Sequence, residues 1–326
     1  MYARAVACVL WIALAAFGQT GPTITGAGYG FAGPIVAPGQ VAQLQVTGLK
    51  TVLAPAYQQA STLPLPTSLA GISVQVSESV QTSTMGTPVV TTYQAPILSL
   101  NQVNLCPGES TSADCRVTYI RVQMPYELTV HFSPALVQTS IAIFEGGVGS
   151  QPFTAGVFFD HIHIVTTCED QPAANTCPQI VTHADGSLVS RASPAQPGET
   201  VVLYAWGLGT TLPRVKTGDA SPVPAPVVNS GPGAVRFDFV PGAGPSQPYA
   251  ARATSVPAYL APGFVGLYQV NVQLPSHFPP VPPCDETTVF SNLTISIGGA
   301  ASFDGAALCV QPLTAQPQSS ARGGSR

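Results

Sequence analysis

The feature that most constrains the fold of this chain is an internal repeat. The segment Pro38–Leu49, PGQVAQLQVTGL, recurs as Pro197–Leu208, PGETVVLYAWGL, with the Pro-Gly start and the Gly-Leu end aligned. Two further patches recur in the same order, and they pair Val122–Pro125 with Val272–Pro275 and Gly146–Ser150 with Gly298–Ser302. Three patches in one order predict that the chain contains two copies of one structural unit.

Each copy carries the alternation of apolar and polar residues that is typical of β-strands. In Leu267–Leu274, LYQVNVQL, the residues Tyr, Val, Val and Leu fall on one face. Asp185–Gly186 separates two short β-rich runs, which is a strong hairpin signal, and Asn292–Ile297 is a further strand that ends at a Gly-Gly turn. No comparable helical stripe is present. The sequence therefore predicts an all-β protein made of two tandem immunoglobulin-like β-sandwich domains, with one larger β-structure as the alternative.

The repeat also predicts where the domains lie. We expect the first β-sandwich at 19–167 and the second at 168–312. Residues 313–326 are polar and rich in Ser, Gly and Arg, a composition that predicts a disordered tail.

Charged residues make up only 8% of the chain, against roughly a quarter in an average soluble domain. The only lysines are Lys50 and Lys216, and the formal net charge is −4. Nucleic-acid binding needs clustered Lys and Arg along the phosphate backbone. The composition therefore excludes nucleic acid as a partner, and the low charge suits a neutral partner.

The first 18 residues have the pattern of a secretory signal peptide. Arg4 precedes an apolar run at Ala5–Phe17, and small residues follow, so we expect cleavage between Gly18 and Gln19. A membrane-spanning helix needs about 20 apolar residues, more than this run provides. The sequence predicts an exported protein, secreted or located at the cell surface or in the periplasm, with no transmembrane segment in the mature chain.

The mature chain would keep six of the seven cysteines, an even number that indicates disulfides in an exported protein. Six cysteines can pair in many ways, so spacing has to decide. Two pairs flank short turn-rich loops of equal length, and a third pair is left over. The predicted disulfides are Cys106–Cys115, Cys168–Cys177 and Cys284–Cys309.

Several motifs of the second half resemble a known family in their order and spacing. They are Ala184–Ser190 (ADGSLVS), Pro194–Gly209, Gly266–Pro275 (GLYQVNVQLP) and Ser291–Ser302. This region resembles the uncharacterised Solibacter-type C-terminal domain of exported acidobacterial proteins, and the first half resembles it more loosely at Leu63–Val76 and Val122–Tyr126. The resemblance implies an exported, immunoglobulin-like β module, and it supplies no catalytic residues.

Few residues suggest chemistry. His161 and His163 share one face of a possible strand, so they are weak candidates for a metal site, but a solvent-facing pair that alternates with core-facing Ile162 and Ile164 is the simpler interpretation. Trp206 could stack on a sugar ring if it is exposed, although its apolar neighbours favour burial in the core. No cofactor is expected.

The sequence carries no hydrolase motif such as Gly-x-Ser-x-Gly or His-Glu-x-x-His. The first functional hypothesis is therefore a non-catalytic module pair with a structural, adhesive or partner-binding role, which predicts an edge strand able to accept a partner strand. The alternative is a neutral-glycan-binding protein with an exposed aromatic strip. A hydrolase is a distant third, because it would require a Ser/His pair or converging carboxylates.

Overall fold

The computed structural model shows an all-β protein, as predicted. It describes residues 21–29, 34–81, 86–106, 112–130, 136–169, 177–229, 231–239, 256–277, 279–284, 291–299 and 302–311. The predicted signal peptide with its cleavage point and the predicted tail lie outside the described residues. Within the described ranges, the one helical element is a short 3-10 turn at Ala113–Cys115, and the rest of the regular structure is strand.

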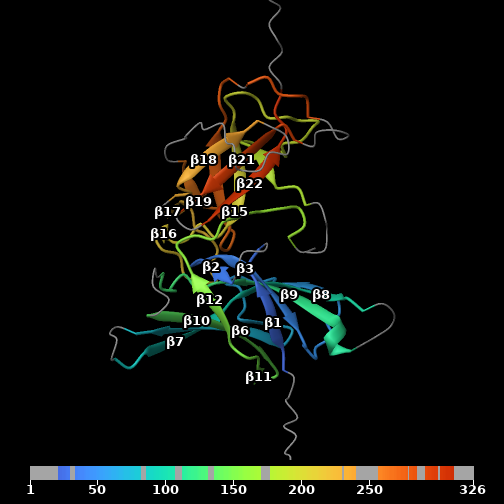
Figure 1. Ribbon diagram of the computed structural model, residues 1–326, viewed down its shortest axis with the longest axis vertical. Helices are drawn as coiled ribbons and strands as arrows, with labels where there is room; N and C mark the ends of the chain where they lie inside the picture. Colours follow the sequence, from blue (N-terminus) through green and yellow to red (C-terminus); the bar gives the residue numbers. More distant parts are fainter. Residues whose placement is uncertain are drawn as a thin grey trace, which may run out of the picture.

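The first half of the chain forms two antiparallel-rich sheets around one apolar core (Figure 1). The five-stranded sheet has the order β1 (Thr23–Ala27), β3 (Val41–Thr47), β9 (Arg116–Gln123), β8 (Ile97–Asn104), β4 (Tyr57–Gln59). The seven-stranded sheet has the order β2 (Ile35–Val36), β12 (Phe153–Val157), β10 (Val137–Glu145), β6 (Ile72–Val80), β5 (Ser68–Leu69), with β11 (Val148–Gly149) on β10 and β7 (Val89–Ala95) on β6. Strands of both sheets contribute to the core, which makes this half a β-sandwich.

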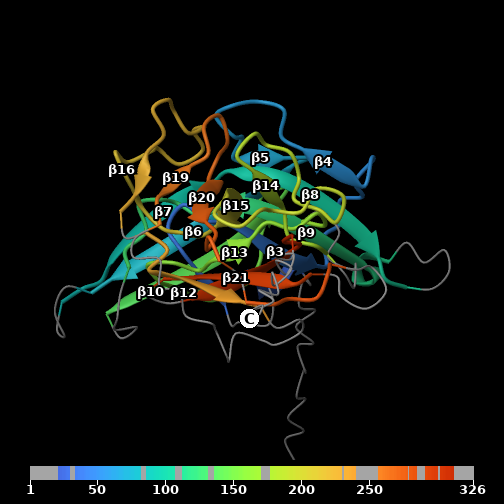
Figure 2. The ribbon, with the colours of Figure 1, turned by 90° about the horizontal axis from the view of Figure 1, so that it is seen from above.

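The second half has its own pair of sheets and its own core, and it lies over the first half in Figures 1 and 2. The larger sheet has the order β13 (His163–Ile164), β15 (Thr200–Trp206), β20 (Tyr268–Gln273), β19 (Ala258–Leu260), β17 (Val227–Val228), β16 (Thr211–Leu212), with β14 (Val181–His183) on β15. The smaller sheet has the order β18 (Ala234–Asp238), β21 (Leu293–Gly298), β22 (Phe303–Leu308).

The repeated motifs occupy equivalent places in the two halves. The first motif forms β3 in one copy and β15 in the other, and the second motif ends β9 and β20. Val41 on β3 lies opposite Gln123 on β9. Thr200 on β15 lies opposite Gln273 on β20, so the two strand pairs share one register. The sequence repeat is therefore also a structural repeat, while the division into two separate domains stays a prediction.

The local strand predictions of the second half are also confirmed. On β20 the side chains of Tyr268, Val270 and Val272 are fully buried, as their alternation predicted. Gly186 takes a positive φ at the predicted hairpin, and the backbone N–H of His183 donates to the carbonyl oxygen of Ser187 across the turn.

The two halves contact each other closely. Tyr126, which follows β9, packs in the core of the second half. In the opposite direction, the backbone N–H of Gly218 donates to Oε1 of Gln123, and the carbonyl oxygen of Gly218 accepts from the N–H of Leu65. Strand β13 already pairs with β15 of the second half, so the chain crosses between the halves before His163, ahead of the predicted boundary at Thr167.

Candidate binding site at the junction

The structure joins the same three cysteine pairs that the spacing predicted. One pair closes a loop of the first half, one lies at the junction, and one ties the chain before β21 to the end of β22. Three disulfides fit an oxidising environment such as the outside of the cell. Among the described residues, no helix is both long and apolar enough to cross a membrane.

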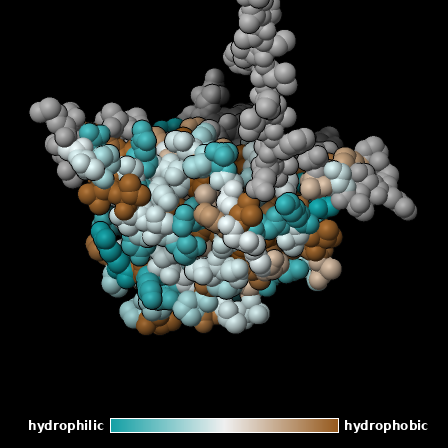
Figure 3. Space-filling model, turned by 90° about the horizontal axis from the view of Figure 1, so that it is seen from below, coloured by the Kyte–Doolittle hydropathy of each residue, from teal (hydrophilic) through white to brown (hydrophobic). Residues whose placement is uncertain are grey.

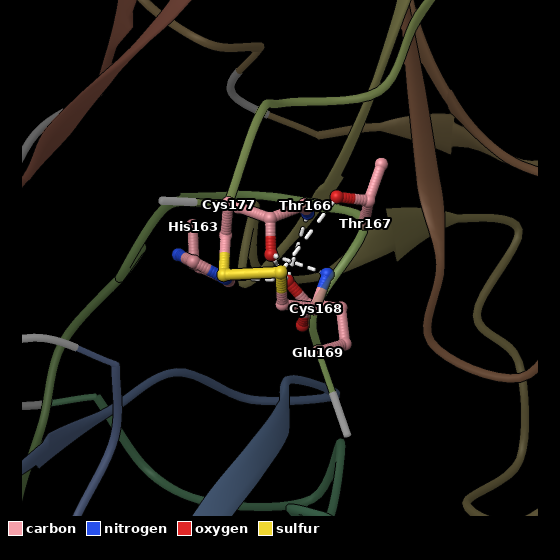
Figure 4. The surroundings of a disulfide bond; sticks show 6 residues. All are labelled: His163, Thr166, Thr167, Cys168, Glu169 and Cys177. Carbon is pink, nitrogen blue, oxygen red and sulfur yellow. Dashed lines mark hydrogen bonds and ion pairs between the residues drawn. A yellow bond between two sulfur atoms is a disulfide. The ribbon is translucent and has the colours of Figure 1, made fainter. Parts of the chain in front are cut away.

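Glu169 lies beside the junction disulfide and collects hydrogen bonds from several elements (Figure 4). Its Oε1 accepts from the backbone N–H of Thr166 at 2.8 Å and the hydroxyl of Thr166 at 3.0 Å. Nε2 of His163 lies 2.9 Å from the same oxygen. The neighbouring Cys168 is bonded to Cys177, so the disulfide restrains the turn that presents this carboxylate.

The second oxygen of Glu169 connects the two halves. Nε1 of Trp206 on β15 donates to Oε2 at 3.1 Å, and the guanidinium of Arg121 on β9 lies 3.7 Å from the same atom. Arg121 also lies over the Trp206 ring, 5.1 Å from its centroid. Burial raises the pKa of Glu169, but the hydrogen bond and charge of His163 and the charge of Arg121 outweigh it, and the net pKa lies below the usual value.

Trp206 is therefore a structural residue. Its side chain is 7% exposed and packs with Val41 and Val165 between the halves. The burial favoured by its apolar neighbours is what the structure shows, and stacking of Trp206 on a sugar ring is excluded.

His163 is held between two carboxylates and an aromatic ring. Its Nε2 faces Glu169, its Nδ1 lies 3.6 Å from Oδ2 of Asp304, and its ring stacks on Tyr29 at 3.9 Å between centroids. Burial lowers the pKa of His163, but the carboxylates of Asp304 and Glu169 raise it by more, and the net pKa is above the usual value. The carboxylates on either side therefore favour the protonated form of His163.

The tautomer of His161 is set by Gln40. The backbone N–H of Ala37 donates to Oε1 of Gln40, which orients the amide so that its NH₂ group faces His161. That group donates to the carbonyl oxygen of His161 and to its Nδ1, each at 3.1 Å. Nδ1 is therefore the acceptor and Nε2 carries the proton. Burial and the charge of His163 lower the pKa of His161, so this ring is neutral.

The expectation that His161 and His163 face solvent is wrong. His161 is 6% exposed, and both residues lie at the contact between the halves rather than on a final strand of the first half. Ile162 and Ile164 do face a core, as expected. Among the described residues, no group of three His, Cys, Asp or Glu side chains is arranged to hold a metal ion.

Side chains at the start of β22 complete the hydrogen bonding of this segment. Ser302 Oγ accepts from the N–H of Ile162 at 2.6 Å, and Asp304 Oδ2 accepts from the N–H of Ile164 at 2.8 Å. The buried Asp160 accepts from the N–H and hydroxyl of Ser302. The sequence analysis missed these residues, although Ser302 ends the third repeated patch. In the first copy the equivalent Ser150 accepts from a backbone N–H in the same way.

A cavity of about 360 Å³ opens among these residues. Its walls combine polar groups with aromatic and aliphatic side chains from both halves. The lining residues include Tyr29, Phe158, His161, His163, Phe303 and Asp304. The volume falls at the lower end of the range of small-molecule pockets.

A second histidine cluster, on the surface of the second half, resembles a catalytic triad. Ser193 Oγ lies 3.2 Å from Nε2 of His183, and Glu199 is hydrogen-bonded to Nδ1. Nε2 also lies 3.1 Å from the carbonyl oxygen of Ser193, an acceptor that requires the proton on Nε2. The hydrogen bond to Glu199 raises the pKa of His183, which favours a ring that donates from both nitrogens over one that takes the serine proton.

The two backbone positions at Ser193 and Pro194 offer no free N–H to an oxyanion. The N–H of Ser193 donates to the carbonyl oxygen of Ser190, and Pro194 has no N–H. The hydrogen bonds of this cluster therefore join the hairpin of His183 to the turn before β15.

The comparisons with known proteins add no assignment. No family model matches the chain, and no curated protein matches it. The resemblance to the Solibacter-type domain thus stays a prediction that depends on the residues quoted for it.

Proposed function

We propose that this protein is an exported, non-catalytic pair of immunoglobulin-like modules with a structural role outside the cell, and that it associates with a second copy of itself. The three disulfides, the all-β fold and the low charge support this proposal. Figure 3 shows one face of the first half, where hydrophobic and hydrophilic areas are small and mixed. The proposal for how two copies meet depends on one observation, the exposed edge strand β7.

Strand β7 pairs with β6 on one side, and no other described strand pairs with it. Its sequence is VVTTYQA, with no charged residue and no proline. Val89 and Val90 are 61% and 65% exposed, and Thr91 and Thr92 are exposed as well. Edge strands usually carry charges, prolines or bulges that prevent pairing with another chain. Strand β7 has none of these, so it is suited to accept a further strand.

The sequence of β7 favours a second copy as the occupant. In an antiparallel pair centred on Thr91, the threonine meets its own copy and Val89 lies opposite Tyr93. Thr–Thr pairs and pairs of β-branched with aromatic residues stabilise adjacent strands by roughly 0.2–1 kcal/mol each. No charge is placed opposite a like charge. A two-fold axis at this point would join the seven-stranded sheets of two molecules.

The oligomeric state of the purified chain tests the proposal. Sedimentation should show a dimer, and Thr91→Lys should make it monomeric because two lysines would meet at the two-fold axis. The matched control is Thr91→Gln, which has similar length and no charge and should leave the dimer intact. A monomeric wild type, or a Thr91→Lys variant as dimeric as Thr91→Gln, would overturn it.

A further inference from the structure

We propose that the cavity at the junction of the two halves binds a short neutral saccharide. This site is separate from β7 and does not depend on self-association. Four observations support it: an unused hydrogen-bond donor, an acceptor, exposed aromatic rings, and charges of both signs around the cavity.

The donor is Nε2 of His161. Gln40 occupies Nδ1 and thereby places the ring proton on Nε2. Among the described residues, Nε2 has no hydrogen-bond partner. His161 lines the cavity. A hydroxyl oxygen of a ligand in the cavity can therefore accept from this N–H.

The acceptor is Asp304, which also lines the cavity. Its Oδ2 accepts from the N–H of Ile164 and its Oδ1 from the N–H of Gly305, and its side chain is still 34% exposed. Each carboxylate oxygen has two lone pairs, so Asp304 can accept from sugar hydroxyls as well. A ligand that both donates and accepts at neighbouring positions therefore fits the polar side of the cavity.

The apolar side is aromatic. Phe158 is 37% exposed and Phe303 is 63% exposed, and both line the cavity. Exposed phenylalanines lose the contribution that burial would give, and a ligand with an apolar face would restore it. A pyranose ring presents C–H groups on its faces and hydroxyls at its rim, which matches aromatic rings beside a donor and an acceptor.

Charges of both signs surround the cavity. Arg121 and His163 lie beside Glu169, His163 also lies near Asp304, and the buried Asp160 is hydrogen-bonded to Ser302. A charged ligand of either sign would therefore meet groups of its own sign as well as of the opposite sign. Hydrogen bonding and aromatic contact therefore favour an uncharged ligand.

Isothermal titration and ligand-observed NMR with the full chain test this proposal. The probes are glucose, galactose, mannose, xylose, N-acetylglucosamine, cellobiose, maltose and lactose, with glucuronate and glucosamine as charged counterparts. We expect at least one neutral sugar to bind at or below about 10 mM, more tightly than its charged counterpart. The imidazole ¹⁵N signals of His161 should report the Nε2–H tautomer and shift when that sugar is added.

Phe303→Ala should weaken the sugar by about tenfold, because the exposed ring supplies contact area and little to the fold. The matched control is Phe264→Ala, since Phe264 is 58% exposed and lies outside the cavity lining. Asp304→Asn should also weaken binding. The proposal is wrong if no neutral sugar binds by about 10 mM, if a charged counterpart binds more tightly, or if Phe303→Ala binds as well as Phe264→Ala.

Discussion

The turns that open the two repeated motifs share one pattern of backbone hydrogen bonds but present different side chains, an amide in one and a carboxylate in the other. In the first copy the N–H of Gln40 donates to the carbonyl oxygen of Ala37, and in the second the N–H of Glu199 donates to the equivalent oxygen of Gln196, both at 3.1 Å. The side chains add a second hydrogen bond across each turn. Oε1 of Gln40 accepts from the N–H of Ala37, and Oε2 of Glu199 accepts from the N–H of Gln196. Each side chain then holds a histidine.

What differs is the group that faces the histidine. The amide of Gln40 donates to His161, so this ring accepts at Nδ1, and its burial lowers its pKa and favours the neutral form. The carboxylate of Glu199 accepts from His183 and raises its pKa, which favours the protonated ring. The neutral pair lies buried at the junction and the charged pair lies at the surface. Because a buried charge costs far more than an exposed one, the amide suits the first copy and the carboxylate the second.

The largest expected effect on stability comes from substitutions of two equivalent glycines, one in each turn. Gly39 and Gly198 both have φ of 75°, so alanine at either position carries the same backbone strain of about 1–2 kcal/mol. A Cβ at Gly198 would lie 3.7 Å from Ser276, an ordinary contact, whereas a Cβ at Gly39 would overlap the ring of Tyr126. Gly39→Ala should therefore lower the free energy of unfolding by more than about 4 kcal/mol. Chemical denaturation measures both losses, and equal losses would show that the first turn does not anchor the junction.

An intermediate effect is expected from Gln40→Glu, which gives the first turn the side chain of the second. The carboxylate would bring a charge into a site where Gln40 is fully buried, and it would face the carbonyl oxygen of His161 without a proton to donate. We expect a loss of about 3 kcal/mol in the free energy of unfolding.

The control for this change is Gln138→Glu, at an exposed position on β10. It should change the free energy of unfolding by less than about 0.5 kcal/mol. In Gln40→Glu, NMR should also find His161 charged at a pH where the wild type is neutral. A variant as stable as Gln138→Glu, with His161 still neutral, would contradict the comparison.

The sequence was sufficient to predict the strands, the repeat and the cysteine pairs, because each depends on local pattern or spacing. Alternation alone placed Tyr268 and Val272 in a core, and loop length alone selected Cys168–Cys177. The sequence was not sufficient to predict the contacts at the junction between the two halves. Whether His161 faces solvent depends on Gln40, which lies far away in the chain, and no pattern in one sequence links the two. The repeat aligns Gln40 with Glu199, but it does not indicate that each of these side chains contacts a histidine.

The smallest expected effect, and the one with a pH dependence, concerns the second copy. Glu199 raises the pKa of His183 above its usual value, with the carbonyl oxygen of Ser193 and the charge of Asp185 contributing in the same direction. A raised pKa in the folded state means that the stabilisation is fully present below the unfolded pKa of about 6.5, and that it is lost as the pH rises through the folded pKa. Glu199→Gln should therefore cost about 0.5–1 kcal/mol near pH 5.5 and little above the folded pKa, since the pair is close to the surface. Denaturation at several pH values, with an NMR titration of His183, measures this.

The control is Asp185→Asn, because Asp185 adds charge without a direct bond to the ring. If Glu199→Gln lowers the free energy of unfolding equally at all pH values, the prediction is wrong. Glu199 would then support the turn through Gln196 rather than through the charge of His183.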